Sequence, residues 1–96
     1  MSPPPPLTPQ ASDLLKVLGH PVRLGIVELL AGGEMSVNVL GDRLGQTQPI
    51  ISGQLRLLRY SGLVKCDRRG GKTYYSLADP GLKKLLACLR RYAEGR

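Results

Sequence analysis

The amino-acid sequence predicts a mainly α-helical domain that carries one small β-hairpin. Two observations lead to this fold class. Apolar residues recur every three or four positions through most of the 96 residues, which is the period of helices packed on a core. Beyond residue 62 the period falls to two, and Gly70-Gly71 interrupts the alternation as a tight hairpin turn does. A chain of this length forms one domain.

The first nine residues, MSPPPPLTP, stand apart from that domain. Proline lacks a backbone donor and favours extended polyproline conformations. We therefore expect residues 1–9 to form a disordered tail and residues 10–93 to form the folded domain. Recognition of the tail by a proline-binding domain is an alternative use of this segment.

Helical spacing predicts three helices in the first half of the domain, over residues 10–18, 20–31 and 36–44. Pro21 suits the first turn of the second helix, and Ser36 is a suitable N-cap for the third. Glycine weakens a helix interior, so we interpret Gly41 as a point where another helix comes close.

A fourth helix is expected over residues 48–61, with Thr47 as its cap and Ile51, Leu55 and Leu58 as its apolar stripe. Strands over 64–69 and 73–77 then flank the glycine turn, and a last helix follows over 80–93. The apolar face of this last helix is Leu82, Leu85, Leu86 and Leu89. A helical hairpin followed by a β-hairpin is the order of a winged helix-turn-helix.

Positive charge is concentrated in the middle of the chain. The net charge is +7, and residues 43–72 hold seven basic residues against Asp67 alone. A basic stretch of this kind is typical of a protein that binds a polyanion, with nucleic acid as the first candidate. A solvated basic surface is the alternative interpretation.

The outer face of the fourth helix suits the major groove of double-stranded DNA. Gln48 offers an amide that can pair with adenine, and the small Gly53 would let the helix backbone approach the DNA. The other side chains that could bond to bases or hold phosphates are Ser52, Gln54, Arg56 and Arg59. A helical hairpin with a solvated face would show the same pattern.

The hairpin tip adds a second basic element directly after the helix-turn-helix. Arg68, Arg69 and Lys72 surround the glycine turn, where a wing would touch phosphates or the minor groove. A solvated turn would explain these cations taken alone. Their position after the fourth helix favours DNA binding by both elements together.

The stretch from Leu14 to Leu86 resembles the ArsR/SmtB family of bacterial transcriptional repressors. The matching segments are LLKVLGHPVRLGIVELL, EMSVNVLGDRLGQTQPIISGQLRLLRYSGLV and RRGGKTYYSLADP. The resemblance implies a winged-helix homodimer joined by its first and last helices, an inverted-repeat operator in double-stranded DNA, and release of DNA on binding an effector. By position, it implies DNA contacts from Thr47, Gln48, Pro49, Ser52, Gly53, Gln54, Arg56, Arg68, Arg69 and Lys72.

The metal-binding motifs of that family are missing here. Metal-sensing members carry Cys-Val-Cys where this chain has Ser36-Val37-Asn38, and others place Asp, His and Glu ligands along the last helix, which here has no His. The single histidine, His20, precedes Pro21 and is interpreted as a capping or surface residue. We expect no metal site and no cofactor.

Cys66 and Cys88 have two interpretations. Both could be small core residues, since Cys66 shares a strand face with Val64 and Cys88 lies among the leucines of the last helix. Alternatively, Cys66 and Cys88 are redox residues of a thiol switch. In its clearest form, a disulfide between the Cys88 residues of two subunits would change the spacing of the recognition helices, making the effector a thiol oxidant.

The predicted function is that of a sequence-specific repressor in the cytoplasm. The chain shows neither a signal peptide nor an apolar run long enough to span a membrane. It has no nucleophile–base constellation, so we expect no enzymatic activity. A winged helix that binds a protein partner and a non-specific architectural DNA binder are the two alternatives.

Overall fold

The computed structural model describes residues 2–4 and 9–95. Its elements in chain order are α1 Pro9–Leu18, α2 Pro21–Ala31, β1 Met35–Ser36, α3 Val37–Leu44, α4 Gln48–Tyr60, β2 Val64–Arg69, β3 Lys72–Leu77 and α5 Gly81–Glu94. The tail predicted for residues 1–9 lies mostly outside the described residues, and α1 already begins at Pro9. No helix in the described ranges is long and apolar enough to cross a bilayer.

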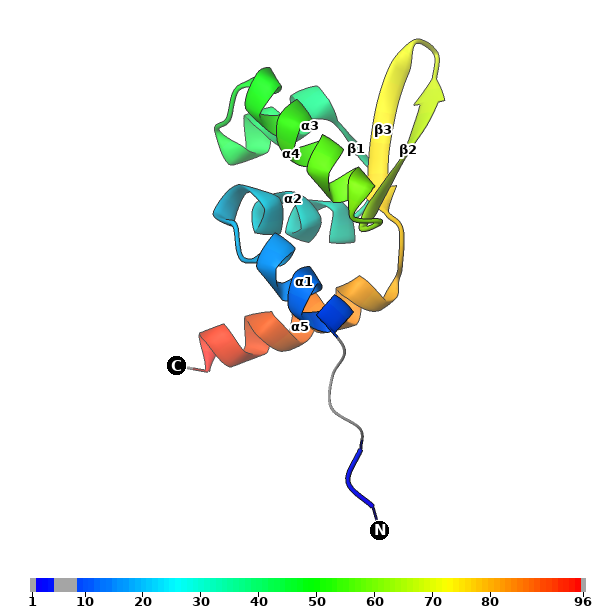
Figure 1. Cartoon of the computed structure of the whole chain (residues 1–96). Coiled ribbons are helices and arrows are strands. Elements are labelled where there is room, and N and C mark those ends of the chain that lie inside the picture. The colour runs from blue at the N-terminus through cyan, green and yellow to red at the C-terminus, as the bar shows by residue number, and fades with distance from the viewer. Residues whose placement is uncertain (1, 5–8, 96) are drawn as a thin grey trace.

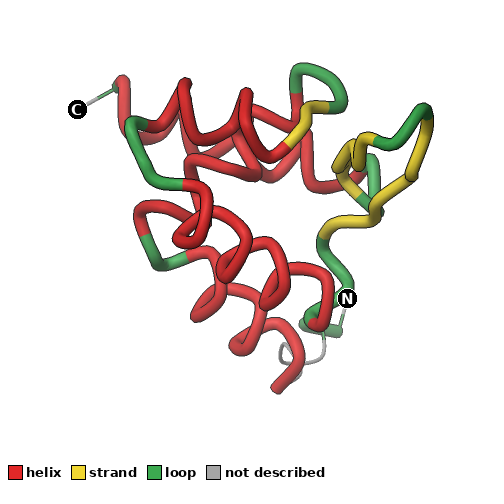
Figure 2. Tube along the Cα trace, turned by 90° about the horizontal axis from the view of Figure 1, so that it is seen from above, coloured by secondary structure: helices red, strands yellow, loops and turns green. Residues whose placement is uncertain are grey.

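Helix α2 is the central element of the fold. It contacts α1, α3, α4, α5 and β3. Figure 1 shows α3, α4 and the β2–β3 hairpin at one end of the molecule and α1 with α5 at the other. Seen from above, the strands lie to one side of the helices (Figure 2). The hairpin and α4 therefore share one end, away from α1 and α5.

The core is built from aliphatic side chains of every helix and of β2. Six of them are almost fully enclosed: Ile26, Val27, Leu40, Ile51, Leu55 and Leu58. Each such side chain stabilises the fold by roughly 1.5–3 kcal/mol relative to an exposed position. Because three of the six come from α4, the helix expected to read DNA is held firmly along its inner side.

The glycine turn between β2 and β3 has the predicted form. Gly70 and Gly71 both have positive φ, 57° and 78°. Two such residues match the right-handed twist of the strands, so Arg69 pairs directly with Lys72. The sequence pattern missed β1, whose two residues pair with Tyr74 and Tyr75 of β3 and place β3 at the centre of the sheet. Two residues are too few to show alternation.

Several local expectations are confirmed and others need correction. His20 is the N-cap of α2, and its Nδ1 accepts from the Val22 amide at 3.2 Å. Ser36 caps α3 through its Oγ. Thr47 occupies the N-cap of α4 but makes no side-chain capping bond. The apolar face predicted for the last helix is only partly buried, because Leu89 is exposed.

Candidate nucleic-acid interface

The turn between α3 and α4 sets the angle at which α4 leaves the core. Gly45 ends α3 in the left-handed conformation, with φ 64°. A Cβ on Gly41 would lie 2.9 Å from the Gln46 carbonyl oxygen, a contact that no side chain tolerates. Gly41 was predicted to admit another helix. The closest atom instead belongs to the turn, and Ile51 of α4 lies 3.8 Å away.

Helix α4 has a fully buried apolar side and an exposed side, and the exposed residues include Ile50 and Leu57, which are 44% and 42% exposed. Ile51, Leu55 and Leu58 have no exposed surface, whereas Pro49, Gly53, Arg56 and Arg59 are exposed. No acidic residue occurs anywhere in α4. The outer face is therefore small and basic near the middle of the helix, as the sequence predicts for a major-groove helix.

Gln48 and Ser52 form a pair on the exposed side of α4. The Gln48 Nε2 donates to Ser52 Oγ at 3.0 Å, one helical turn further along. The bond holds the Gln48 amide along the helix rather than free in solvent. Both residues belong to the predicted DNA contacts, and the structure brings them together.

Gln54 has a partner that sequence spacing did not reveal. Its Oε1 accepts from Arg23 Nη1 of α2 at 3.0 Å, and both side chains are half-buried. The Arg23 Nε also donates to the Val17 carbonyl oxygen of α1 at 2.6 Å. Gln54 is therefore tied to the protein interior, unlike its neighbours on the outer face.

A polar hollow separates α4 from the hairpin. Its volume is about 520 Å³, and it is lined by Ser52, Arg56, Arg59, Tyr60 and Tyr75. Two guanidinium groups and three hydroxyl groups can all donate hydrogen bonds to phosphate oxygens. Tyr60 and Tyr75 were not predicted as site residues. Tyr60 follows Arg59 at the end of α4, so its place was visible in the helical spacing, whereas Tyr75 reaches the hollow from β3, which is distant in sequence.

The wing cations differ from one another. Arg68 and Lys72 are exposed. Arg69 donates to Glu34 through Nη2, lies 3.4 Å from Asp67 through Nε, and stacks 4.5 Å above the Tyr74 ring. The hydrogen bond to Glu34, together with nearby acidic charges, raises the pKa of Arg69 above its ordinary value. The positive charge of Arg69 is therefore already paired with Glu34 and Asp67.

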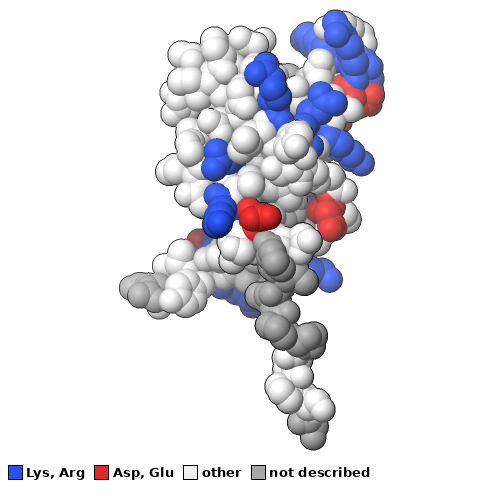
Figure 3. All heavy atoms as spheres, viewed as in Figure 1, with Lys and Arg blue, Asp and Glu red and all other residues white. Residues whose placement is uncertain are grey.

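Basic side chains gather on one face of the molecule. Figure 3 shows Lys and Arg over the hairpin tip and along the adjoining helices, with few acidic side chains between them. The surface combines the outer face of α4, the hollow and the wing. Because basic side chains recur across it, this surface suits an extended polyanion such as DNA.

The two cysteines lie on different elements and neither forms a disulfide. Cys66 is half-buried opposite Tyr75. Cys88 is exposed on α5, where Arg91 Nη2 donates to its Sγ at 3.6 Å. The interpretation of Cys88 as a core residue is wrong. Within the described part of the chain, no three His, Cys, Asp or Glu side chains cluster as metal ligands.

The sequence matches a known family over the helix-turn-helix. The profile described as "Bacterial regulatory protein, arsR family" matches residues 20–65. The biofilm growth-associated repressor of Xylella fastidiosa is 40% identical over 80 residues, covering 83% of this chain and 70% of the relative.

Solved structures agree with the sequence match. The crystal structure of the transcriptional repressor BigR from Xylella fastidiosa superimposes with a TM-score of 0.80 at 40% identity, covering 84% of this chain and 83% of that one. A homodimeric winged helix-turn-helix DNA-binding domain from Mycobacterium bovis gives a TM-score of 0.81 at 31% identity, covering 90% and 80%.

Proposed function

The chain belongs to the ArsR family and is a transcriptional repressor, and we propose that it binds an inverted-repeat operator as a homodimer. The outer face of α4 reads base edges in the major groove, and the wing holds the flanking backbone. The division of α4 into a fully buried apolar side and an acid-free outer side carries this proposal. The activity is binding, without catalysis.

The proposed base contacts come from the first turns of α4. They are made by the residues that lead into the groove, Thr47, Gln48, Pro49, Ser52 and Gly53, with Gln54 at the inner edge. Arg56 and Arg59 hold phosphates at the hollow, and Arg68, Arg69 and Lys72 do so from the wing. A good bidentate base contact discriminates by about 1–3 kcal/mol.

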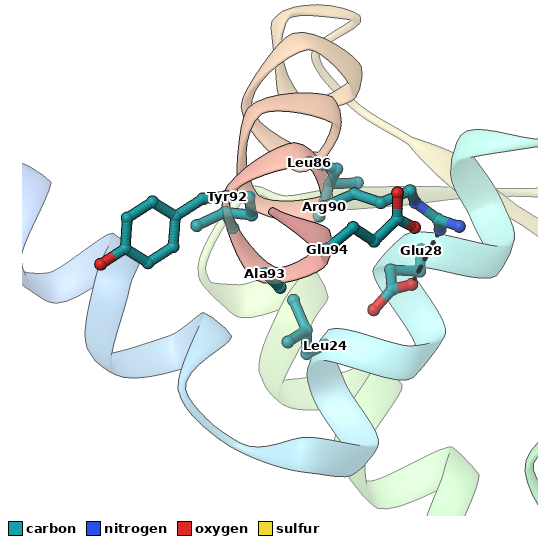
Figure 4. A pocket seen from close by; sticks show the side chains of 8 residues that line it. Leu24, Glu28, Leu86, Arg90, Tyr92, Ala93 and Glu94 are labelled. Atoms are coloured by element: carbon teal, nitrogen blue, oxygen red, sulfur yellow. Dashed lines mark hydrogen bonds and ion pairs between the residues drawn. The ribbon is translucent and has the colours of Figure 1, made fainter. Parts of the chain in front are cut away.

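The proposed dimer joins two copies through α1 and α5. Leu15 is 55% exposed on α1, and Leu89 is 41% and Tyr92 67% exposed on α5. A groove of about 460 Å³ runs between α2 and α5, with Leu24, Leu86 and Ala93 on its apolar side and the Glu28–Arg90 ion pair at its edge (Figure 4). Burial of such surface against a second copy would stabilise a thin core. The Mycobacterium bovis neighbour is homodimeric.

Two-fold symmetry gives the operator its proposed form. A symmetric dimer presents two copies of α4, so its DNA carries two inverted half-sites about 34–36 Å apart, in successive major grooves. Phosphate neutralisation supplies much of the affinity, with a salt slope of about −0.9 per contact.

Thiol oxidation is the effector that we propose for release of DNA. The Cys88 sulfur is exposed on α5, one of the two helices that we place in the dimer interface. A disulfide between two Cys88 residues would fix a different spacing of the α4 helices. Cys88→Ser should abolish the effect of an oxidant on DNA affinity. An equal response of wild type and Cys88→Ser would rule this effector out.

Selection from a random pool of DNA duplexes tests the proposed function. The reduced protein should enrich an inverted repeat with half-sites about one helical turn apart. Salt-sensitive binding without enrichment would instead identify an architectural DNA binder. A complete lack of duplex binding would favour a winged helix that binds a protein partner.

A further inference from the structure

Arg23 joins three helices through one guanidinium group. It lies in the first turn of α2, its Nε donates to the Val17 carbonyl oxygen in the last turn of α1, and its Nη1 donates to Gln54 Oε1 of α4. The two distances are 2.6 and 3.0 Å. The carbonyls of a last helical turn have no partner within their own helix, so Arg23 also caps the end of α1.

The stability of α2 does not explain an arginine at this position. The amino end of a helix carries a partial positive charge, which disfavours a cation in the first turn. The first turn of α2 contains no acidic residue to offset it. Both acceptors of Arg23 belong to other helices. Arg23 therefore contributes by linking α2 to α1 and α4.

The chemistry of the bond also fixes the orientation of Gln54. Arginine has donors only, so the amide of Gln54 must turn its carbonyl oxygen toward Arg23. Gln54 immediately follows Gly53, which lies on the exposed face of α4. A change in this anchor would therefore rotate or shift the face that is proposed to read bases.

We propose that Arg23 is a positioning residue that couples the placement of α1 to that of the recognition helix α4. The inference rests on the proposed function, in which α1 helps to join two protomers and α4 reads DNA. With Arg23 in place, the dimer holds its two α4 helices at one separation. Without it, α4 stays packed on the core but loses its direct link to α1, and the dimer tolerates operators of altered spacing.

The preference of the dimer for one spacing between half-sites can be measured, and the loss of a single base contact would not change it. The dissociation constant is measured on the operator enriched by the wild type and on the same operator with one base pair inserted between its half-sites. The ratio of the two constants is the spacing selectivity. Losing a contact to one base weakens both duplexes alike and leaves this ratio unchanged.

The variants form a double-mutant cycle, Arg23→Met, Gln54→Met and the two combined, with Arg43→Met as a control. Arg43 is an exposed cation in the last turn of α3, outside the proposed dimer helices, so its loss removes the same charge without the connection. Each single variant should lower the spacing selectivity about five-fold or more. The double variant should lose no more than either single one, because both remove the same connection. Arg43→Met should keep the wild-type ratio.

Salt dependence separates positioning from a direct phosphate contact. Arg23→Met should retain the wild-type salt slope, whereas loss of a phosphate contact would reduce it by about 0.9. A reduced slope with unchanged spacing selectivity would overturn the proposal, as would additive losses in the double variant. Gln54→Met keeps the Arg23–Val17 bond, so it tests the connection even if Arg23→Met does not fold.

The wild-type measurement tests the proposed function separately. A wild-type protein that binds both spacings equally contradicts the symmetric-operator proposal itself. A selective wild type with equally selective variants contradicts only the role of Arg23.

Discussion

Two glycines of the helix-turn-helix show how one residue type serves packing in one place and function in another. Gly41 is required by the protein's own backbone, because the Gln46 carbonyl oxygen occupies the space that a Cβ would need. At Gly53, a Cβ would meet no atom within 4 Å beyond its chain neighbours and the adjoining backbone of its own helix. Since glycine in a helix interior costs about 1 kcal/mol relative to alanine, the fold gains nothing from Gly53. Close approach of DNA to α4 would explain it.

Gly53→Ala should therefore stabilise the protein and weaken its DNA binding. We expect the free energy of unfolding to rise by about 0.5–1 kcal/mol, as measured by urea denaturation. Affinity for the selected operator should fall about tenfold or more, a loss of about 1.4 kcal/mol. Gly41→Ala is the contrasting variant, and it should destabilise the fold. Unchanged operator affinity in Gly53→Ala would remove Gly53 from the interface.

The wing cations should also contribute unequally. Lys72→Ala should weaken binding to operator and shuffled duplexes alike and reduce the salt slope by about 0.9. Arg69→Ala should weaken binding less, because Glu34 and Asp67 already compete with phosphate for its guanidinium. Glu34→Gln should release Arg69 and strengthen binding. Anisotropy titrations over a range of salt concentrations measure all three effects, and an Arg69→Ala loss larger than that of Lys72→Ala would contradict this assignment.

At the scale of elements, local signals predicted local structure. The Gly70-Gly71 turn and the burial of Ile51, Leu55 and Leu58 follow from neighbouring residues and from helical spacing, and both are confirmed. Contacts between distant segments gave no such signal. The Arg23–Gln54 bond spans 31 positions and the Arg69–Glu34 bond 35. The pairing of β1 with β3 was missed for the same reason, since a two-residue strand can be recognised only from its pairing with a distant strand.

The two sides of α4 should respond differently to the same substitution. Leu55→Ala removes a fully buried side chain, so it should lower the free energy of unfolding by about 2–5 kcal/mol. Leu57→Ala is the matched control, because Leu57 is 42% exposed. Its effect should stay within about 0.5 kcal/mol. Equal losses by thermal or urea denaturation would contradict the assignment of the inner face.

At the scale of the whole molecule, the fold places two surfaces at opposite ends. The basic surface of α4 and the wing occupies one end, and α1 with α5 occupies the other. The sequence pattern located the basic surface because charge is visible residue by residue. It placed Leu89 on the apolar face of the last helix but did not show that this side chain is exposed, since an apolar helix face looks the same whether it packs on its own domain or on a second copy.

Self-association should depend on that exposed face of α5. Leu89→Glu would place a charge in the proposed dimer interface and should shift the protein toward the monomer, with weaker operator binding as a consequence. Asn38→Glu, an equal charge change on an exposed position of α3, should leave self-association unchanged. Sedimentation velocity over a range of protein concentrations measures both. A Leu89→Glu protein that dimerises like the wild type would place the interface elsewhere.

A titration with known stoichiometry shows whether a dimer reads a specific duplex through α4. The reduced protein is titrated against the selected inverted repeat and against a shuffled duplex of equal length and composition, near physiological salt. We expect two protomers per inverted repeat and binding at least about 10³-fold tighter than to the shuffled duplex. Equal affinity for the two duplexes, or one protomer per operator at saturation, would contradict this expectation.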